Sequence, residues 1–183
     1  PAALHRASTQ SRSRGRPCRR LGGAGRSRDR RKLIQTMGVR REGREAAVQF
    51  LYQRDLNPTS EIADLGVFYK MRGLSPSARR FCDVLVRGVL ENQAAIDEVI
   101  KEHAQNYQLH RISAVDRNII RLAIYEMQNC PEVPPVVSIN EAIEIAKKYS
   151  TDESGRFVNG VLDHVRETLS RPARTASAAQ PGE

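Results

Sequence analysis

The sequence predicts an all-α fold of six or seven helices, and three observations lead to it. Apolar residues recur at the i, i+3, i+4 spacing of one helix face in several separate stretches. Helix start signals precede these stretches, and Ser75-Pro76 is the clearest, because serine caps a helix start and proline suits the first helical position. The period-two alternation of strands is missing apart from the brief Val136-Val137. Helices joined by short loops favour a packed helical bundle.

The expected helices follow one another along the chain. They span residues 39–56, a short stretch from Thr59 or Ser60 through Tyr69 to a stop at Gly73, residues 76–100, and a segment that begins after a weaker cap at Ser113. The helix of residues 76–100 is the longest, at about seven turns, and Gly88 within it allows close approach of a neighbour. Residues 130–135 contain three prolines and are expected to be extended, since proline removes a donor and disfavours helix before it.

Two further helices are expected on either side of a polar turn within residues 137–165. Ser138 and Glu141 have the spacing of a capping box, and the helix that they begin should end near Tyr149. Capping oxygens in residues 150–154 start the next helix, whose buried face repeats from Phe157 to Val165.

Composition divides the chain into three parts. Of the 30 Arg and Lys residues, eleven lie in residues 1–36 beside a single acidic residue, Asp29, so the remaining 19 basic residues face 20 acidic ones. The net charge of +9 therefore belongs to the N-terminal segment, and the rest of the chain is close to neutral. We expect residues 1–36 to be a disordered basic extension, residues 37–169 to form the domain, and residues 170–183 to be a disordered tail.

Three explanations fit residues 1–36. Their Arg-rich, Ser-rich and acid-poor composition is typical of a transit peptide. It also suits a basic arm that binds RNA, or sequence upstream of a true start at Met37. The abrupt beginning of organised sequence at Met37-Gly38 favours the last of these.

Cysteine usage and hydropathy predict a soluble cytoplasmic protein. Cys18, Cys82 and Cys130 are widely spaced and odd in number, which favours a reducing compartment. No apolar run approaches the roughly 20 residues needed to span a bilayer, and the N-terminus lacks a secretory segment.

Residue patterns that carry catalysis are missing. His103, His110 and His164 are isolated in sequence and are interpreted as surface histidines, and the cysteines lack zinc-like spacing. The glycines of residues 22–25 have no strand before them or helix after them, so they do not indicate a phosphate loop. We expect a protein that is not an enzyme and that uses no cofactor or metal.

Basic and aromatic residues gather at the two ends of the predicted domain. Arginines in the first turns of a helix oppose its dipole and suggest an anionic ligand, although Glu42 and Glu45 would also compensate them on a solvated face. Around the polar turn, aromatic side chains could stack on unpaired bases while basic side chains hold phosphates. The same aromatic side chains could equally be part of the hydrophobic core. The candidate RNA-binding residues are Arg40, Arg41, Arg44, Lys148, Tyr149, Arg156 and Phe157.

The pair Asn159-Gly160 falls within a helical stripe, although Asn-Gly normally indicates a hairpin. Glycine in a helix costs roughly 1 kcal/mol relative to alanine. We therefore expect a structural role, in which Gly160 admits a neighbouring helix and Asn159 bonds to a backbone group.

Four stretches together resemble the NusB transcription antitermination family. They are residues 40–52 (RREGREAAVQFLY), 116–126 (DRNIIRLAIYE), 139–147 (INEAIEIAK) and 157–163 (FVNGVLD). They stand in the family's order and spacing, and the last two together are specific. The resemblance covers residues 37 to about 169 and leaves residues 1–36 without a counterpart.

The resemblance implies two packed helical subdomains and a role that is not enzymatic. NusB-like proteins pair with NusE, a ribosomal protein of the small subunit, bind the boxA element of nascent ribosomal RNA and join the elongating RNA polymerase. By position, Arg40, Arg41 and Arg44 match the family's arginine-rich first helix, and Tyr149 and Phe157 lie near its RNA surface. Tyr52 matches a tyrosine near the NusE side.

Two other functions stay open from the sequence. One is a homodimeric protein-interaction module that buries the arginine face and does not contact RNA. The other is an enzyme, because NusB-like domains also occur fused to ribosomal RNA methyltransferases. The enzyme would need an α/β domain with a Gly-rich loop after a strand, and no stretch here has that pattern.

Overall fold

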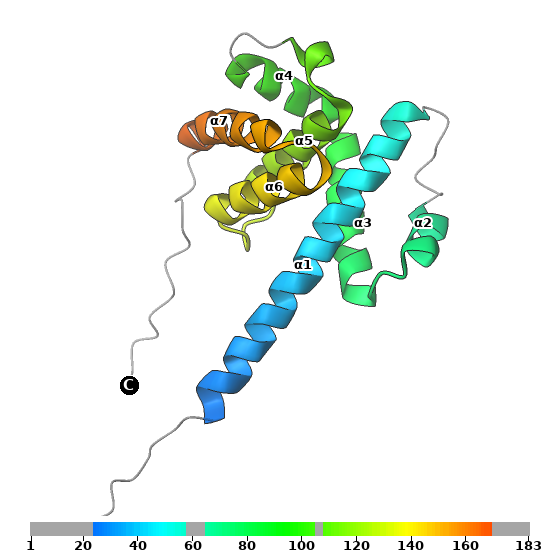
Figure 1. Cartoon of the computed structure of the whole chain (residues 1–183), viewed down its shortest axis with the longest axis vertical. Helices are drawn as coiled ribbons and strands as arrows, with labels where there is room; N and C mark the ends of the chain where they lie inside the picture. The colour runs from blue at the N-terminus through cyan, green and yellow to red at the C-terminus, as the bar shows by residue number, and fades with distance from the viewer. Residues whose placement is uncertain (1–23, 58–64, 105–107, 170–183) are drawn as a thin grey trace, which may run out of the picture. The chain divides into compact units, whose positions relative to one another are not determined.

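Seven α-helices and one short 3-10 helix make up the described part of this computed structural model (Figure 1). The structure describes residues 24–57, 65–104 and 108–169, with side chains from Gly38 onward. The elements are α1 (Ala24–Leu56), α2 (Leu65–Arg72), α3 (Pro76–Glu91), α4 (Gln93–His103), the 3-10 helix η2 (Leu109–Arg111), α5 (Ala114–Asn129), α6 (Pro135–Tyr149) and α7 (Asp152–Thr168). Within these ranges no strand occurs, and the predicted all-α class is confirmed.

Helix α1 starts at Ala24, well before the predicted start at residue 39. Arg, Lys, Leu and Gln, which favour helix, are frequent in residues 26–37, and no proline interrupts the chain between Pro17 and Pro58. The helical residues 24–36 thus differ from the predicted disorder, while residues 1–23 and 170–183 lie outside the described residues. Arg40 is more than four turns from the helix start, so the dipole argument for an anion there is wrong.

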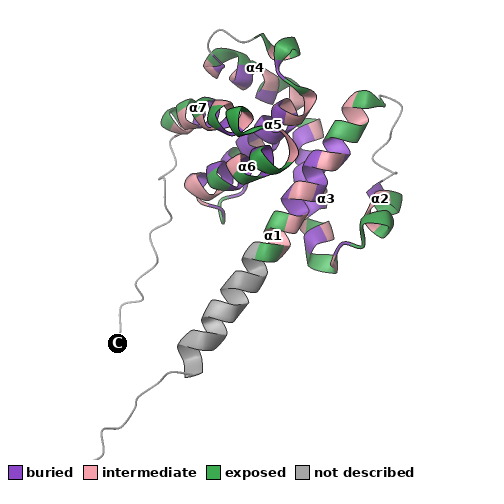
Figure 2. Cartoon of the chain, in the orientation of Figure 1, coloured by how far each residue is buried: buried purple, intermediate pink, exposed green. Residues whose placement is uncertain are grey.

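The chain divides into two compact units, residues 1–34 and residues 35–183. The core belongs to the second unit, and α5 is its central helix: ten of its 16 residues are buried (Figure 2). Helices α3, α4, α6 and α7 all pack against α5, and α6 and α7 pack on each other. Most of this core is aliphatic, in a sequence without Trp.

Helix α1 packs against α2 and α3 through aromatic rings. Phe50 of α1 meets Phe68 of α2 edge-on, with 5.5 Å between the ring centroids. Gly43 of α1 lies so close to α3 that a Cβ on it would be 3.0 Å from Cδ1 of Phe81. Gly73, at φ +61°, follows the end of α2 in the left-handed conformation that glycine tolerates, as predicted.

Three of the five predicted helix caps are confirmed, and the cap expected at Thr59 or Ser60 lies outside the described residues. The side chains of Ser75, Ser113 and Thr151 each accept a hydrogen bond from a backbone N–H three residues on. The capping box at Ser138 is wrong, because α6 already begins at Pro135, where proline suits the first helical position. Residues 130–133 form a turn, closed by the Val133 N–H on the Cys130 carbonyl at 3.0 Å, and are not extended.

The predicted long helix of residues 76–100 is two helices. Asn92 separates α3 from α4, and both its backbone N–H and its side-chain amide donate to the Gly88 carbonyl, at 3.1 and 2.8 Å. An asparagine side chain that bonds to the backbone in this way competes with the helical pattern. Gly88 has the predicted close neighbour, because a Cβ on it would overlap the ring of Tyr125.

Gly160 does not have its predicted role. It is exposed, and a Cβ built on it would meet nothing within 4 Å among the described residues. Asn159 makes no hydrogen bond to a backbone group in this part of the chain; it lines a cavity between α6 and α7. Gly43 and Gly88 are the glycines that admit neighbours.

Gly160→Ala and Gly88→Ala are therefore expected to change stability in opposite directions. The first should raise the free energy of unfolding by about 0.5–1 kcal/mol, the helix advantage of alanine over glycine. The second should lower it by about 1–2 kcal/mol, because Tyr125 must leave its place over α3. Urea denaturation followed by circular dichroism measures both, and a gain in stability for Gly88→Ala would contradict the packing described here.

Candidate functional site

Arg44 is buried against carboxylates and does not reach solvent. Its side chain is 3% exposed, its Nη2 lies 2.7 Å from Oε1 of Glu126, and its Nη1 lies 3.8 Å from Glu141. The guanidinium also packs over the Phe81 ring, 5.3 Å from the ring centroid. The sequence prediction that Arg44 contacts RNA is thus corrected: Arg44 ties α1 to α5 and α6.

Arg40 and Arg41 are only partly engaged. Arg41 makes two hydrogen bonds to Glu141, at 2.9 and 2.7 Å, and its side chain is still 49% exposed. The hydrogen bond to Glu141, and then its charge, raise the pKa of the guanidinium. Arg40 lies 3.7 Å from Glu132. Both arginines reach solvent, so both remain candidates for contact with an anion.

Lys148 and Tyr149 are held against α1 by Glu45. The Lys148 ammonium lies 2.6 Å from Oε2 of Glu45, and the Tyr149 hydroxyl donates to the same oxygen at 2.9 Å. The Tyr149 hydroxyl also accepts from Gln49 at 2.8 Å. The hydrogen bond to Glu45 is the main cause of the raised pKa of Lys148. Tyr149 therefore fastens α6 to α1, and its ring is half-buried.

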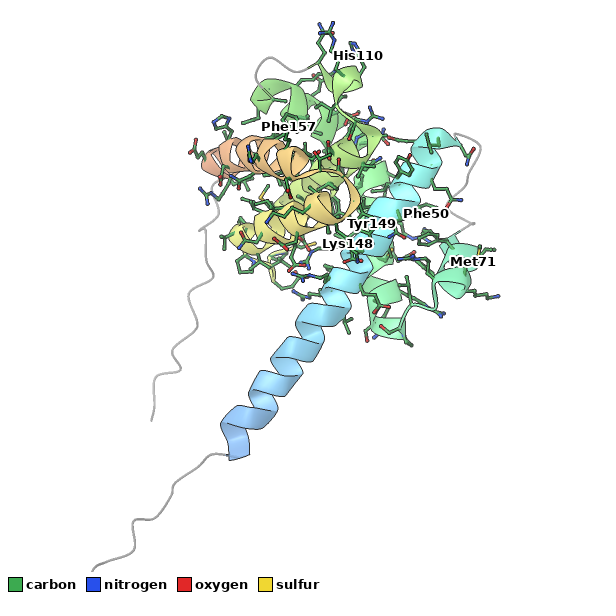
Figure 3. All side chains as sticks on the ribbon, viewed as in Figure 1. Phe50, Met71, His110, Lys148, Tyr149 and Phe157 are labelled. Atoms are coloured by element: carbon green, nitrogen blue, oxygen red, sulfur yellow. The ribbon has the colours of Figure 1, made fainter. Side chains whose placement is uncertain are left out.

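Phe157 and Arg156 lie on α7 and face different cavities. Figure 3 shows Phe157 on α7, with Tyr149 and Lys148 beside α1. Arg156 lines a cavity of about 560 Å³ between α6 and α7, together with Lys147 and Asn159. The predicted residues thus do not form one cluster, because successive helix positions point in different directions.

The cavity beside Phe157 combines an aromatic ring with polar groups, and we call it the α7 cavity. Its volume is about 320 Å³, and it is lined by Arg111, Ile112, Ser113, Asp116, Thr151, Glu153, Ser154 and Phe157. It lies where the start of α5 meets the turn before α7. The α7 cavity therefore offers a ring for stacking, a cation, and carboxylate and hydroxyl oxygens.

Asp116 is the buried polar group of the α7 cavity. The residue is 7% exposed, and its Oδ2 accepts from the Ser154 hydroxyl at 3.1 Å. Its Oδ1 is buried without a hydrogen-bond partner in the described part of the chain. A buried carboxylate oxygen without a partner is costly, so a hydrogen-bond donor that reached this oxygen would stabilise it.

Sequence reasoning missed Asp116 and Arg111 as site residues. Asp116 could not be recognised from the sequence, because its partner at the site, Ser154, is 38 residues away. Arg111 lies in η2, a 3-10 turn without an apolar period. The buried position of Asp116 on α5 was no distinguishing signal, since Asn118, Arg121 and Glu126 of the same helix are buried as well.

Other features of the described residues do not form a second site of this kind. Burial raises the pKa of the Cys82 thiol to about 12, so this thiol stays protonated at neutral pH. Groups of three His, Cys, Asp or Glu side chains with the geometry to hold a metal ion are not found in the described ranges. In the same ranges, the helices are too short or too polar to cross a membrane.

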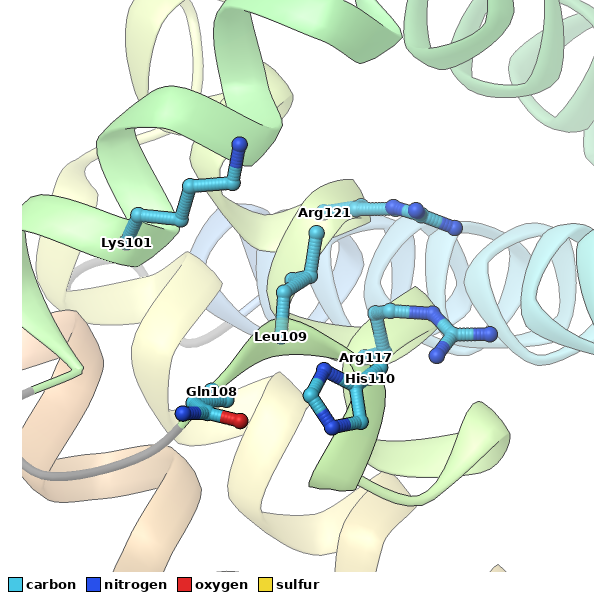
Figure 4. Close-up of a pocket in the computed structure, with 6 residues that line it drawn as sticks. All are labelled: Lys101, Gln108, Leu109, His110, Arg117 and Arg121. Atoms are coloured by element: carbon cyan, nitrogen blue, oxygen red, sulfur yellow. The ribbon is translucent and has the colours of Figure 1, made fainter.

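A further cavity, of about 550 Å³, lies between α4, η2 and α5 (Figure 4). It is lined by Lys101, His110, Arg117 and Arg121, and the guanidinium groups of both arginines are already paired with carboxylates. Arg121 makes two hydrogen bonds to Asp97, at 2.7 and 2.8 Å, and Arg117 donates to Asp55 at 2.8 Å. Aliphatic stems therefore form its wall, and the arginines connect α5 to α1 and α4.

The described part of the chain is an all-helical protein with a cavity that combines an aromatic ring and polar groups, and comparison with known proteins identifies its family. A family model described as the NusB family matches residues 41–167. The chain belongs to the NusB family.

Relatives and solved structures agree with this assignment. The chain is 44% identical over 138 residues to a transcription antitermination protein NusB of Sorangium cellulosum, covering 75% of this chain and 99% of that protein. It is 45% identical to a Bacillus cereus NusB, covering 71% and 98%. The structure resembles NusB of T. maritima (34% identity, TM-score 0.66, 72% and 93% covered). It also resembles a chain in a crystal structure of NusB and NusE with double-stranded RNA (25%, 0.67, 73% and 99%).

Proposed function

We propose that this protein is a transcription antitermination factor of the cytoplasm. It binds boxA-type RNA of nascent ribosomal RNA transcripts together with NusE and acts on elongating RNA polymerase. The observation that carries the RNA-binding part is the α7 cavity, where Phe157, Arg111 and the partly unsatisfied Asp116 meet.

The chemistry of the α7 cavity suits an unpaired nucleobase. The Phe157 ring offers a face for stacking, which is how single-stranded RNA is usually recognised. In this proposal the amino group of adenine, cytosine or guanine donates to Oδ1 of Asp116, which has no hydrogen-bond partner among the described residues. Arg111, at the rim, is exposed and suits a neighbouring phosphate. In this proposal the cavity selects a single-stranded base that carries an amino group.

Cations on the neighbouring surface extend this site so that it can follow an RNA strand beyond the bound base. Arg156 is exposed, and no carboxylate pairs with it among the described residues. Lys147 shares its cavity but pairs with Glu144 at 3.0 Å, and Lys148 and Arg41 are paired with Glu45 and Glu141. Arg156 is therefore the strongest phosphate ligand of the predicted set, and Arg40, Arg41 and Lys148 add weaker attraction.

A surface for NusE is supported by Tyr52. Its side chain is among the exposed large hydrophobic ones, at 37% exposure on α1. An exposed tyrosine combines apolar area with a polar end, which is typical of protein interfaces. The NusB chain that resembles this structure was crystallised with NusE and double-stranded RNA, and it supports the same pairing here.

A binding titration of boxA-type single-stranded RNA with and without NusE tests the proposal. At one fixed salt concentration, RNA should bind the protein with NusE at least about tenfold more tightly than the protein alone, an added stabilisation of about 1.4 kcal/mol. Salt must be fixed because phosphate contacts weaken as ionic strength rises. A duplex of the same sequence serves as the control, since the proposed cavity requires an unpaired base.

Equal, weak binding of both RNAs with NusE present would contradict the proposal. Sedimentation with and without RNA then tests the homodimeric interaction module. A dimer that persists in the presence of RNA, with any RNA bound away from the arginine face, would support that module and argue against an RNA site on that face.

A further inference from the structure

A groove between α1 and α2 lies outside the proposed RNA site, and we call it the α2 groove. Its volume is about 370 Å³, and it is lined by Phe50, Gln53, Val67, Phe68, Met71 and Arg72. Figure 3 labels Phe50 on α1 and Met71 on α2. None of these residues lines the α7 cavity.

The wall of the α2 groove exposes aliphatic side chains to water. Met71 is 83% exposed and Val67 is 60% exposed, and both are among the most exposed large hydrophobic residues of the described chain. They lie one helical turn apart, so they form one continuous patch. Neighbouring apolar side chains exposed along a groove are typical of a protein interaction site.

The rim of the α2 groove is basic. Helix α2 contains Lys70 and Arg72 and no acidic residue. Both side chains are exposed, and neither pairs with a carboxylate within the described ranges. This distinguishes them from Arg41 and Lys148, whose charges are compensated by glutamates.

We propose that the α2 groove docks an amphipathic helix of a partner protein, with apolar side chains on one face and acidic residues beside them. Methionine adapts its shape to different partners, and a helix laid in a groove presents apolar anchors at i, i+3 and i+4. The acidic flanks would meet Lys70 and Arg72, which gives the pairing its electrostatic complementarity.

The same observations argue against two other occupants. A second copy of this chain docked through the same groove would bring two basic rims together, which is unfavourable. RNA would need an aromatic face to stack on, but Phe50 is 1% exposed and Phe68 is half-buried with its ring packed edge-on against Phe50 and Tyr69. The groove thus fits a protein helix better than a nucleic acid.

Fluorescence anisotropy with the full chain and two labelled peptides tests the inference. Both are amphipathic peptides of 16 residues, which form about four helical turns, with leucine at i, i+4, i+7 and i+11. One peptide carries glutamates at the positions that flank the leucines, and the other carries lysines there. The glutamate peptide should bind at least about tenfold more tightly than the lysine peptide. Met71→Ser with Val67→Ser should weaken that binding about tenfold or more.

Val84→Ser is the matched control, because Val84 is 51% exposed on α3 and does not line the groove. It should leave peptide binding unchanged. Lys70→Glu with Arg72→Glu should reverse the preference, so that the lysine peptide binds more tightly.

Four results would overturn the inference. The first is equal binding, or no binding, of the two peptides by the unaltered chain. The second is self-association that Met71→Ser abolishes, which would assign the groove to a second copy. The third is loss of RNA binding in Met71→Ser, and the fourth is loss of NusE binding, because either would assign the groove to the proposed antitermination complex.

Discussion

Arg44→Ala is expected to lower the free energy of unfolding by about 3–5 kcal/mol, the largest effect of a single substitution considered for this protein. Glu126 is 0% exposed, and Arg44 provides its buried cation, with contacts of 2.7 to 3.1 Å. Without Arg44, the Glu126 carboxylate would stay buried beside an empty space and without its main partner. Urea denaturation followed by circular dichroism measures the loss.

Arg41→Ala is the matched control for this prediction. Arg41 is also paired with a glutamate, but its own side chain is 49% exposed, and Glu141 would keep a second cation, because Nη1 of Arg44 lies 3.8 Å from it. Loss of Arg41 should therefore cost less than loss of Arg44. A second comparison replaces both charges with Arg44→Met and Glu126→Leu, which removes the unpaired charge and should recover most of the loss. If Arg44→Ala costs no more than Arg41→Ala, the buried ion pair described here is wrong.

The expected loss of stability in Arg44→Ala affects which variants can test RNA binding. The sequence pattern alone predicts that Arg41→Ala with Arg44→Ala weakens RNA binding and leaves helicity unchanged. Because Arg44 is buried, that double variant is expected to be destabilised, and reduced RNA binding would then report unfolding. Variants at exposed or half-buried positions are needed, such as Arg156 and Phe157.

Local signals in the sequence predicted most helices correctly. Caps at Ser75, Ser113 and Thr151 depend on residues only three positions apart, so their chemistry can be read from the sequence. The apolar period on α5 and α7 depends on the helix repeat alone. The start of α6 was misplaced because the helix begins before a plausible cap at Ser138, and a cap residue does not forbid helix before it. The start of α1 was misplaced because residues 24–38 lack the apolar period that indicates a helix.

The candidate site was harder to predict, because its contacts join distant residues. Arg41 and Glu141 are 100 positions apart, and Arg44 and Glu126 are 82 apart. An arginine-rich helix face looks the same in sequence whether its charges meet solvent or buried glutamates. The resemblance to the NusB family gave the fold and the function. Which arginine of that face is buried depends on which glutamates the fold places beside it, and these lie far away in the sequence.

Phe157→Ala is expected to weaken binding of boxA-type single-stranded RNA by about 1–3 kcal/mol, the contribution of one base stacked on an aromatic ring. This corresponds to roughly five-fold to more than a hundred-fold in affinity. Phe157 lines the α7 cavity and is half-buried, so its ring can serve both the cavity and the packing of α7. The measurement is a titration at fixed salt with NusE present.

Two further variants separate stacking from packing. Phe157→Tyr keeps an aromatic face, so it should retain RNA affinity within a few fold if stacking is the cause. Tyr149→Phe keeps a ring but loses the hydroxyl that bonds to Glu45 and Gln49, so it should change stability and leave RNA affinity nearly unchanged. Thermal unfolding of all three variants shows whether each is folded at the titration temperature. Unaltered RNA affinity in a folded Phe157→Ala protein would place the RNA elsewhere on the molecule, and the α7 cavity would then lose its proposed role.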